Sequence, residues 1–215
     1  MLKTEWELVY LRENCISKEI CNEIIEKFEI SPRKYYGVTS GGGYDKSKKN
    51  TIDFNIPICS EDVNTTEYEK ELWLSHSEVI TKTLGKHLQI YSEIVDNKYK
   101  GIRGMMNLFT EVYLFHKYIK GEGGFVDHSD NEISKHEGSR VKERMLTFLF
   151  YLNDVEEGGE TIIGNDIKIK PKAGSLLIFP ASWTYPHRGE TPLSSDKYII
   201  TGWLHRVTGV DFSNP

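Results

Sequence analysis

The sequence His128-Ser129-Asp130 could supply half of a metal site. It follows an extended stretch that ends near Tyr118 and the glycine-rich sequence KGEGG. In an extended chain residues i and i+2 point to the same side, so both side chains can reach one ion. With a second histidine they would form the 2-His-1-carboxylate triad that is typical of non-haem Fe(II). The plain alternative is a polar loop with an Asx-type turn.

A second sequence, His76-Ser77-Glu78, has the same spacing but a different setting. It lies within a helical pattern, where residues two apart do not share a face and cannot chelate one ion. We therefore expect a solvated helix face. Because about one such match arises by chance at ordinary composition, the spacing by itself has little weight.

Five other histidines could supply the third ligand, and the residues alone do not decide among them. His87 belongs to the helical pattern, His136 to a charged insertion, and His116 to the middle of an expected strand. His187 follows the apolar sequence LLIFPASWTYP, and His205 ends the last expected strand and is its main rival.

The elements that must position these residues change in type along the chain. SKEICNEIIEKFEI predicts a helix behind a Ser17 N-cap, and a second helical pattern covers about Glu67 to Leu88. TSGGGYDKSKKNTIDFNIPI has the composition of a loop. From Met105 onward, short segments rich in β-branched and aromatic residues predict strands: NLFTEVYLFHKY, RMLTFLFYLN, ETIIG, DIKIK, SLLIFP and KYIITGWLHR. The charged insertion Asn131 to Arg144 predicts a mobile loop between strands.

Composition narrows the class of protein. A chain of 215 residues with 38% hydrophobic residues fits one domain, here a β-sandwich or barrel with helices on one outer face. The net charge of -5 argues against a large nucleic-acid footprint. The three cysteines have no C-x-x-C spacing, which favours a reducing compartment. With no secretory signal and no apolar run of about 18 residues, we expect a soluble cytoplasmic protein with no membrane partner. The sequence makes no prediction of the oligomeric state.

Four sequence blocks resemble the prolyl 4-hydroxylase branch of the iron(II)/2-oxoglutarate dioxygenases. They occur in the family's order over roughly residues 107–206: YIKGEGGFVDHSD, LTFLFYLNDVEEGGET, IKPKAGSLLIFPASWTYPHRGE and KYIITGWLHR. The resemblance implies a mainly β fold, a double-stranded β-helix (jelly roll) with N-terminal helices packed on the outer face. It also implies a single catalytic domain, 1–215, in which 1–104 is a helical support and lid segment and 105–207 is the jelly-roll core.

The resemblance also implies roles for particular residues. His128, Asp130 and His187 would bind the metal. Lys197, ten positions after His187, would bind the distal carboxylate of 2-oxoglutarate with help from Tyr151. The rest of the 2-oxoglutarate pocket would be formed by Tyr118, Thr147 and Trp203.

Strand parity is an independent check on these roles. In LTFLFYLN alternate residues face opposite sides of the sheet. One face carries Thr147, Leu149 and Tyr151, and the other carries Leu146, Phe148 and Phe150. A nearly continuous apolar strand is expected to be buried on both faces.

Lys197 shares a strand face with Ile199 and Trp203. Burial of a lysine there is unfavourable unless an anion meets it, and 2-oxoglutarate would be that anion. The structural alternative is a lysine at a strand start whose ammonium reaches water.

The implied activity is an Fe(II)- and 2-oxoglutarate-dependent hydroxylation of peptidyl proline that consumes O2 and yields succinate and CO2, with ascorbate as a reductant. The partner would then be a peptide or protein. Alternatives are the same chemistry on a free amino acid, another side chain or a nucleobase, and a jelly-roll binding protein without catalysis. We expect Thr39 to Phe54, as a lid, and the insertion Asn131 to Arg144 to form the rim that selects the substrate.

Overall fold

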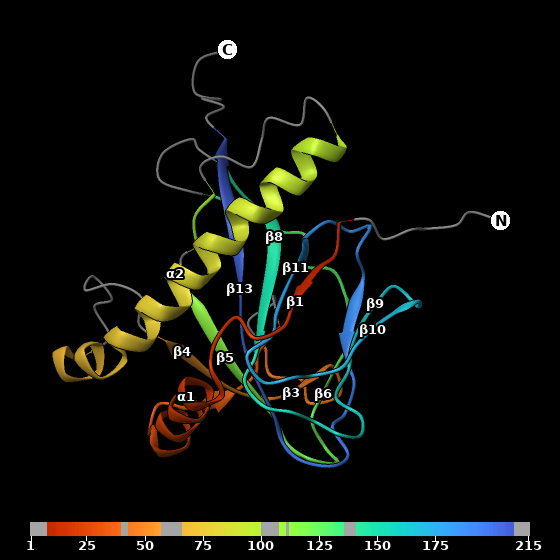
Figure 1. Cartoon of the computed structure of the whole chain (residues 1–215). Helices are drawn as coiled ribbons and strands as arrows, with labels where there is room; N and C mark the ends of the chain where they lie inside the picture. The colour runs from red at the N-terminus through yellow and green to blue at the C-terminus, as the bar shows by residue number, and fades with distance from the viewer. Residues whose placement is uncertain are drawn as a thin grey trace.

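A computed structural model describes residues 8–39, 43–56, 66–99, 108–110, 112–135 and 141–208. A long helix lies across one face of a strongly twisted set of strands, with a shorter helix below it (Figure 1). The elements are β1 Tyr10–Arg12, α1 Lys18–Ile30, β2 Tyr35–Tyr36, β3 Lys49–Asn50, β4 Ile52–Ile56, α2 Glu67–Lys98, β5 Tyr113–Tyr118, β6 Gly124–His128, β7 Ile133–Lys135, β8 Val141–Tyr151, β9 Thr161–Ile163, β10 Ile167–Ile169, β11 Leu176–Pro180, β12 His187–Gly189 and β13 Lys197–Thr208.

The strands of the described residues form two antiparallel sheets. The larger sheet has eight strands in the order β1-β11-β8-β13-β5-β4-β2, with β7 paired to β8. The smaller sheet has five strands in the order β10-β9-β12-β6-β3. Apolar side chains from both sheets meet between them, among them Tyr118, Tyr151 and Ile163. Neighbours in each sheet are mostly distant in sequence, as in a jelly roll.

The two helices pack on the outer face of the larger sheet. Ser17 caps α1, where its hydroxyl accepts a hydrogen bond from the Ile20 amide. Phe28 of α1 stacks on Phe115 of β5, with ring centroids 4.0 Å apart. The helix α2 runs ten residues beyond the predicted end and buries Trp73 against the same apolar cluster. The predicted fold class, a mainly β jelly roll with helices on its outer face, is confirmed.

The N-terminal part contains more strand than the prediction of a helical support segment allowed. β1, β2 and β4 belong to the larger sheet, and β3 belongs to the smaller one. The sequence Ile52 to Ile56, predicted as loop, is a strand that pairs with β5. Its alternation of apolar and polar residues was the missed signal, masked by the glycines and lysines that precede it.

Two described parts of the charged insertion Asn131 to Arg144, which was predicted as a loop, are strands instead. β7 pairs with the first residues of β8. Residues 136–140, including His136, lie outside the described part of the chain. Among the described helices, none is both long enough and apolar enough to span a membrane.

Candidate metal centre

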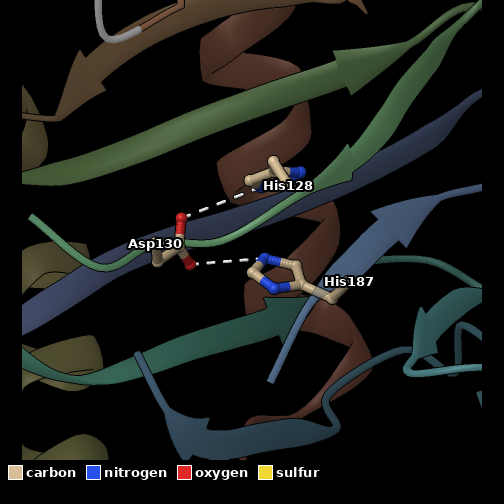
Figure 2. A group of neighbouring side chains, drawn as sticks. All are labelled: His128, Asp130 and His187. Atoms are coloured by element: carbon tan, nitrogen blue, oxygen red, sulfur yellow. Dashed lines mark ion pairs between the residues drawn. The ribbon is translucent and has the colours of Figure 1, made fainter. Parts of the chain in front are cut away.

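Two paired strands bring His128 and His187 together although they are 59 positions apart in sequence. β6 and β12 are antiparallel, and His187 is the direct partner of His128. Directly opposed residues in antiparallel strands project to the same face of the sheet. The two imidazole ring centroids are 4.2 Å apart. Asp130 follows the end of β6 and turns back toward both rings (Figure 2).

The three side chains face one another through their ligand atoms. The distance from His187 Nε2 to Asp130 Oδ2 is 3.3 Å, and that from His128 Nε2 to Asp130 Oδ1 is 3.7 Å (Figure 2). All three ligand atoms lie within 4.8 Å of one another. Asp130 and His187 are buried, and His128 is partly exposed. Within the described residues, this is the only group of His, Cys, Asp and Glu with such a geometry.

Backbone carbonyls hold both imidazoles in the same way. His128 Nδ1 lies 2.8 Å from the Val126 carbonyl oxygen, and His187 Nδ1 lies 3.1 Å from that of Tyr185. Because a carbonyl oxygen only accepts, each Nδ1 carries a proton, and in the neutral imidazole each Nε2 then keeps its lone pair. This arrangement is typical of histidines that bind metal through Nε2.

Neighbouring side chains fix the three groups further. The Thr147 hydroxyl donates a hydrogen bond of 2.7 Å to Asp130 Oδ2. Phe125 stacks on the His128 ring with centroids 3.6 Å apart, and Phe179 meets the His187 ring edge to face. Thr147, predicted to line the 2-oxoglutarate pocket, therefore also orients the carboxylate of Asp130.

Burial and mutual charge set the protonation of the group. Burial, and to a smaller extent the charge of His187, lower the pKa of His128 to about 4. Burial alone would raise the pKa of Asp130, but hydrogen bonds and the charges of His187 and His128 hold that pKa below its usual range. Burial would lower the pKa of His187, but its contact with Asp130 raises it overall. Two imidazole nitrogens and one ionised carboxylate on one face fit Fe(II) and leave open positions for further ligands.

Near this group of three residues, Lys197 is buried and its ammonium has no hydrogen-bond partner among the described residues. Its side chain is 0% exposed. The Nζ atom lies 4.6 Å from the ring centroid of Tyr118 and 6.0 Å from that of Tyr151. Burial lowers the pKa of Lys197 to about 7. A buried ammonium with no acceptor is unfavourable, so this position fits an anionic ligand such as a carboxylate of 2-oxoglutarate.

The other residues predicted for the 2-oxoglutarate pocket lie around the same interior. Tyr118 is the direct partner of Lys197 across β5 and β13. The Tyr151 hydroxyl donates a 2.8 Å hydrogen bond to Thr161 Oγ1. Trp203 lies closer to the entrance, where the guanidinium of Arg144 stacks 3.6 Å from its ring centroid.

An inner and an outer cavity meet at His128 and Asp130, two of the three facing side chains. The inner cavity is bordered by Tyr118, Thr147 and Thr161. The outer cavity, of about 620 Å³, is bordered by Tyr35, Val38, Thr39 and other residues of the N-terminal segment. His128, Asp130 and Trp203 border both cavities. Access to the candidate metal centre is therefore shaped in part by residues before β4.

The remaining histidines have other surroundings. His205, the rival third ligand, is buried beside Phe109 and is not part of the group of three. His87 contacts the Tyr10 hydroxyl at 2.8 Å. His76 is buried and contacts Lys27 and Glu23, so the prediction of a solvated helix face was wrong for this residue. Helix α2 turns it toward α1.

A buried polar cluster near the outer cavity was missed in the sequence. Lys49, Asp53 and His116 are each at most 5% exposed. They come from β3, β4 and β5, respectively. The available signal was the alternation in TIDFNI, which places Asp53 on the face opposite Phe54 and Ile56.

Part of this chain is similar to known proteins. Residues 113–205 match the 2OG-Fe(II) oxygenase superfamily. A PKHD-type hydroxylase of Crocosphaera subtropica is 31% identical over 85 residues, which cover 37% of this chain and 36% of that protein. Probable prolyl 4-hydroxylase 9 of Arabidopsis thaliana is 32% identical over 92 residues, 31% of each chain. The chain thus spans about a third of the length of these relatives.

Solved structures share the fold. A viral collagen prolyl hydroxylase from Paramecium Bursaria Chlorella virus-1, in a 2OG complex, matches with a TM-score of 0.61 and 20% identity over 95% of this chain and 99% of that one. A prolyl hydroxylase from Trichoplax adhaerens, in complex with a hypoxia inducible factor peptide fragment, matches with a TM-score of 0.63 and 17% identity over 91% and 82% of the two chains. Over residues 113–205 the chain is similar to the 2OG-Fe(II) oxygenase superfamily. Within that superfamily it resembles the prolyl 4-hydroxylases.

Proposed function

We propose that this protein is an Fe(II)- and 2-oxoglutarate-dependent dioxygenase that hydroxylates proline in a peptide or protein. One observation carries the proposal: a buried lysine ammonium without a partner lies in the same interior as two histidines and an aspartate that face one another. Such a lysine is explained by an anionic ligand, and such a triad by a metal ion with open positions. Both groups are needed together for a 2-oxo acid to bind at a metal.

His128, Asp130 and His187 would hold Fe(II) through two Nε2 atoms and a carboxylate oxygen. Lys197 would pair with the distal carboxylate of 2-oxoglutarate, and Tyr118 and Tyr151 would form the walls around its chain. The indole N–H of Trp203 is also buried without a partner among the described residues, so it could donate to a bound ligand. Fe(II) with 2-oxoglutarate and O2 supplies oxidation of a C–H bond, with succinate and CO2 as coproducts. Ascorbate would serve as a reductant that keeps the metal in the Fe(II) state.

The charges around the outer cavity favour a substrate residue inside a peptide over a free amino acid. Each charged side chain described in its wall already lies beside an opposite charge: Lys48 with Asp45, Lys49 with Asp53, Asp127 with Arg188, Asp130 with His187, and Arg144 with Glu132. The ammonium and carboxylate of a free amino acid would lose their hydration on binding and would find no unpaired charge in this wall, so their burial is unfavourable. The amides of a peptide are neutral and need only hydrogen bonds. The same argument disfavours a nucleic-acid substrate, whose phosphates require available cations.

To test the proposal, the protein is first loaded with Fe(II) and 2-oxoglutarate under anaerobic conditions. A panel of proline-containing peptides is added, and O2 is then admitted. We expect the peptide to gain one oxygen atom and succinate to form in equal amount. Free proline at the same concentration should remain unmodified. If free proline is hydroxylated and no peptide is, the substrate is a free amino acid and the proposed peptide substrate is wrong. Absence of succinate in every reaction would contradict the catalytic proposal and favour a binding protein.

A further inference from the structure

The chain crosses from the smaller sheet to the larger one beside the candidate metal centre. In β3, Lys49 pairs with Phe125 of β6. In β4, Asp53 pairs with His116 of β5. Thr51 is the only residue between these two strands. The N-terminal segment thus joins the strand that carries His128 to the opposite sheet.

A buried charged cluster lies at this crossing. Lys49 Nζ donates to Asp53 Oδ2 at 2.7 Å and lies 3.4 Å from His116 Nε2. The Thr51 hydroxyl donates to Asp53 Oδ1 at 2.7 Å. Burial lowers the pKa of His116 to about 3, so this imidazole is neutral and its Nε2 can accept from the ammonium. A buried ion pair gains little stability over apolar residues of similar size, so stability alone is a weak reason for its presence.

The cluster is tightly enclosed. A Cβ atom at Gly37 would overlap Thr51 Oγ1 and would lie 3.1 Å from Asp53 Oδ2. The amide of Gly37 also donates to the Thr51 carbonyl at 2.9 Å. The chain preceding β3 therefore covers the cluster closely, which limits the movement of Lys49 and Asp53.

The cluster is connected to His128 by two routes. The ammonium of Lys49 lies 5.5 Å from the ring centroid of Phe125, and that ring stacks on the imidazole of His128 with an interplanar angle of 15°. In the backbone, the Val126 amide donates to the Lys48 carbonyl at 2.9 Å. The carbonyl of the same Val126 faces His128 Nδ1. Both groups that orient the imidazole thus contact β3 or Lys48, the residue directly before it.

We propose that the buried cluster of Lys49, Asp53 and His116 is a positioning element of the metal centre, which fixes the imidazole of His128 through Phe125 and β3. The inference rests on the proposed function, because it requires that His128 binds a metal. It gives the N-terminal segment a role in metal affinity in addition to its place around the outer cavity. The charges are kept because they fix one geometry of the sheet crossing.

The test compares metal binding in three variants of the full chain, with Co(II) alone as the probe. The double variant Lys49→Met/Asp53→Leu removes both charges and leaves neither unpaired. Phe125→Leu removes the stacked ring and leaves the cluster intact. We expect both to bind Co(II) about 10- to 100-fold more weakly than the wild type, as for other partners of metal ligands, and to shift its visible d–d spectrum. Lys49→Arg retains the positive charge and should bind Co(II) with an affinity close to that of the wild type.

A matched control removes an ion pair on the outer side of β5, the strand that carries His116. Lys117 follows His116 on β5 and pairs with Glu29 at 2.7 Å, away from the metal centre. Lys117→Met/Glu29→Gln should change the melting temperature without changing Co(II) affinity or spectrum. A folded Lys49→Met/Asp53→Leu variant with wild-type affinity and spectrum would overturn the inference. If that variant does not fold, Phe125→Leu decides, and wild-type binding there would overturn it. Failure of the wild type to bind Co(II) would instead refute the proposed metal site itself.

Discussion

The two buried faces of the larger sheet are built from the same strands but have opposite chemistry. On the outer face, Phe148 and Phe150 of β8 and Ile200 of β13 pack into an apolar cluster beneath the helices. On the inner face, alternate residues of the same strands include Tyr151, Thr147 and Lys197. Because successive residues point to opposite sides, one strand can hold the fold together and also furnish a reactive interior.

The comparison shows where stability and function are separated in this molecule. The outer face satisfies its apolar groups by packing alone. The inner face keeps a lysine without a partner, and the smaller sheet opposite it presents a group of two histidines and an aspartate; only bound ligands would satisfy these groups fully. Substitutions on the inner face should therefore impair binding with little loss of stability, and substitutions on the outer face should do the reverse.

The largest expected effect is from His187→Ala on the inner side. This change removes one of three proposed ligands, so Fe(II) binding and succinate formation should fall to background while the far-ultraviolet circular dichroism stays unchanged. His128→Ala and Asp130→Ala should behave alike. Anaerobic Fe(II) titration measures the effect. Retained turnover in any of the three would remove that residue from the metal centre.

On the outer face, Phe148→Ala should lower the free energy of unfolding by about 3–5 kcal/mol, as for other large-to-small changes in a core. Phe148 is fully buried in the cluster under the helices. Denaturant unfolding measures the loss. Fe(II) affinity of the fraction that remains folded should not change, and a large loss of affinity there would show that the two faces are coupled.

Lys197→Met should separate stability from function in a single residue. Replacing the buried, unpaired ammonium by an apolar side chain should raise the free energy of unfolding of the ligand-free protein by roughly 1–4 kcal/mol. Binding of 2-oxoglutarate should be lost, while Fe(II) binding remains. Calorimetry with and without 2-oxoglutarate measures both quantities. Unchanged 2-oxoglutarate affinity would refute the proposed role of Lys197.

The same lysine predicts a pH dependence of 2-oxoglutarate binding. Its pKa is lowered to about 7 by burial in the ligand-free protein, and a bound carboxylate would raise it. Binding above the ligand-free pKa must then take up a proton, so affinity should fall as the pH rises above about 7, by up to about tenfold per pH unit. Lys197→Arg, which stays protonated, should abolish this slope. A slope that persists in Lys197→Arg would assign it to another group.

A smaller effect is expected from Thr147→Val. The change preserves side-chain shape but removes the hydrogen bond to Asp130, so Fe(II) affinity should fall by about tenfold. Thr201→Val is the matched control, because the Thr201 hydroxyl donates to the Phe148 carbonyl and not to a proposed ligand. Equal losses in both variants would mean that the hydroxyl of Thr147 has no special role in orienting Asp130.

The same contrast explains how much could be predicted from the sequence. Parity assigned both faces of β8 because LTFLFY is long and its two faces differ in chemistry. The short strands β3 and β12 were not predicted. Two or three residues show no periodicity, and they form a strand only when a neighbouring strand pairs with them. His128 and Asp130 were proposed together from their spacing, but His187 was chosen as the third ligand only from the family resemblance, because its antiparallel pairing with His128 is a long-range contact. The cluster of Lys49, Asp53 and His116 was missed because three separate strands build it.

The most direct test of the account is an anaerobic titration of the purified protein with Fe(II) and then with 2-oxoglutarate. The measured signal is the visible charge-transfer absorption band that forms when a 2-oxo acid chelates Fe(II). We expect the band in the wild type, its loss in His187→Ala, and a much higher requirement for 2-oxoglutarate in Lys197→Met. A folded wild-type protein that shows no band at saturating Fe(II) and 2-oxoglutarate would contradict the proposal that its inner face is a dioxygenase site.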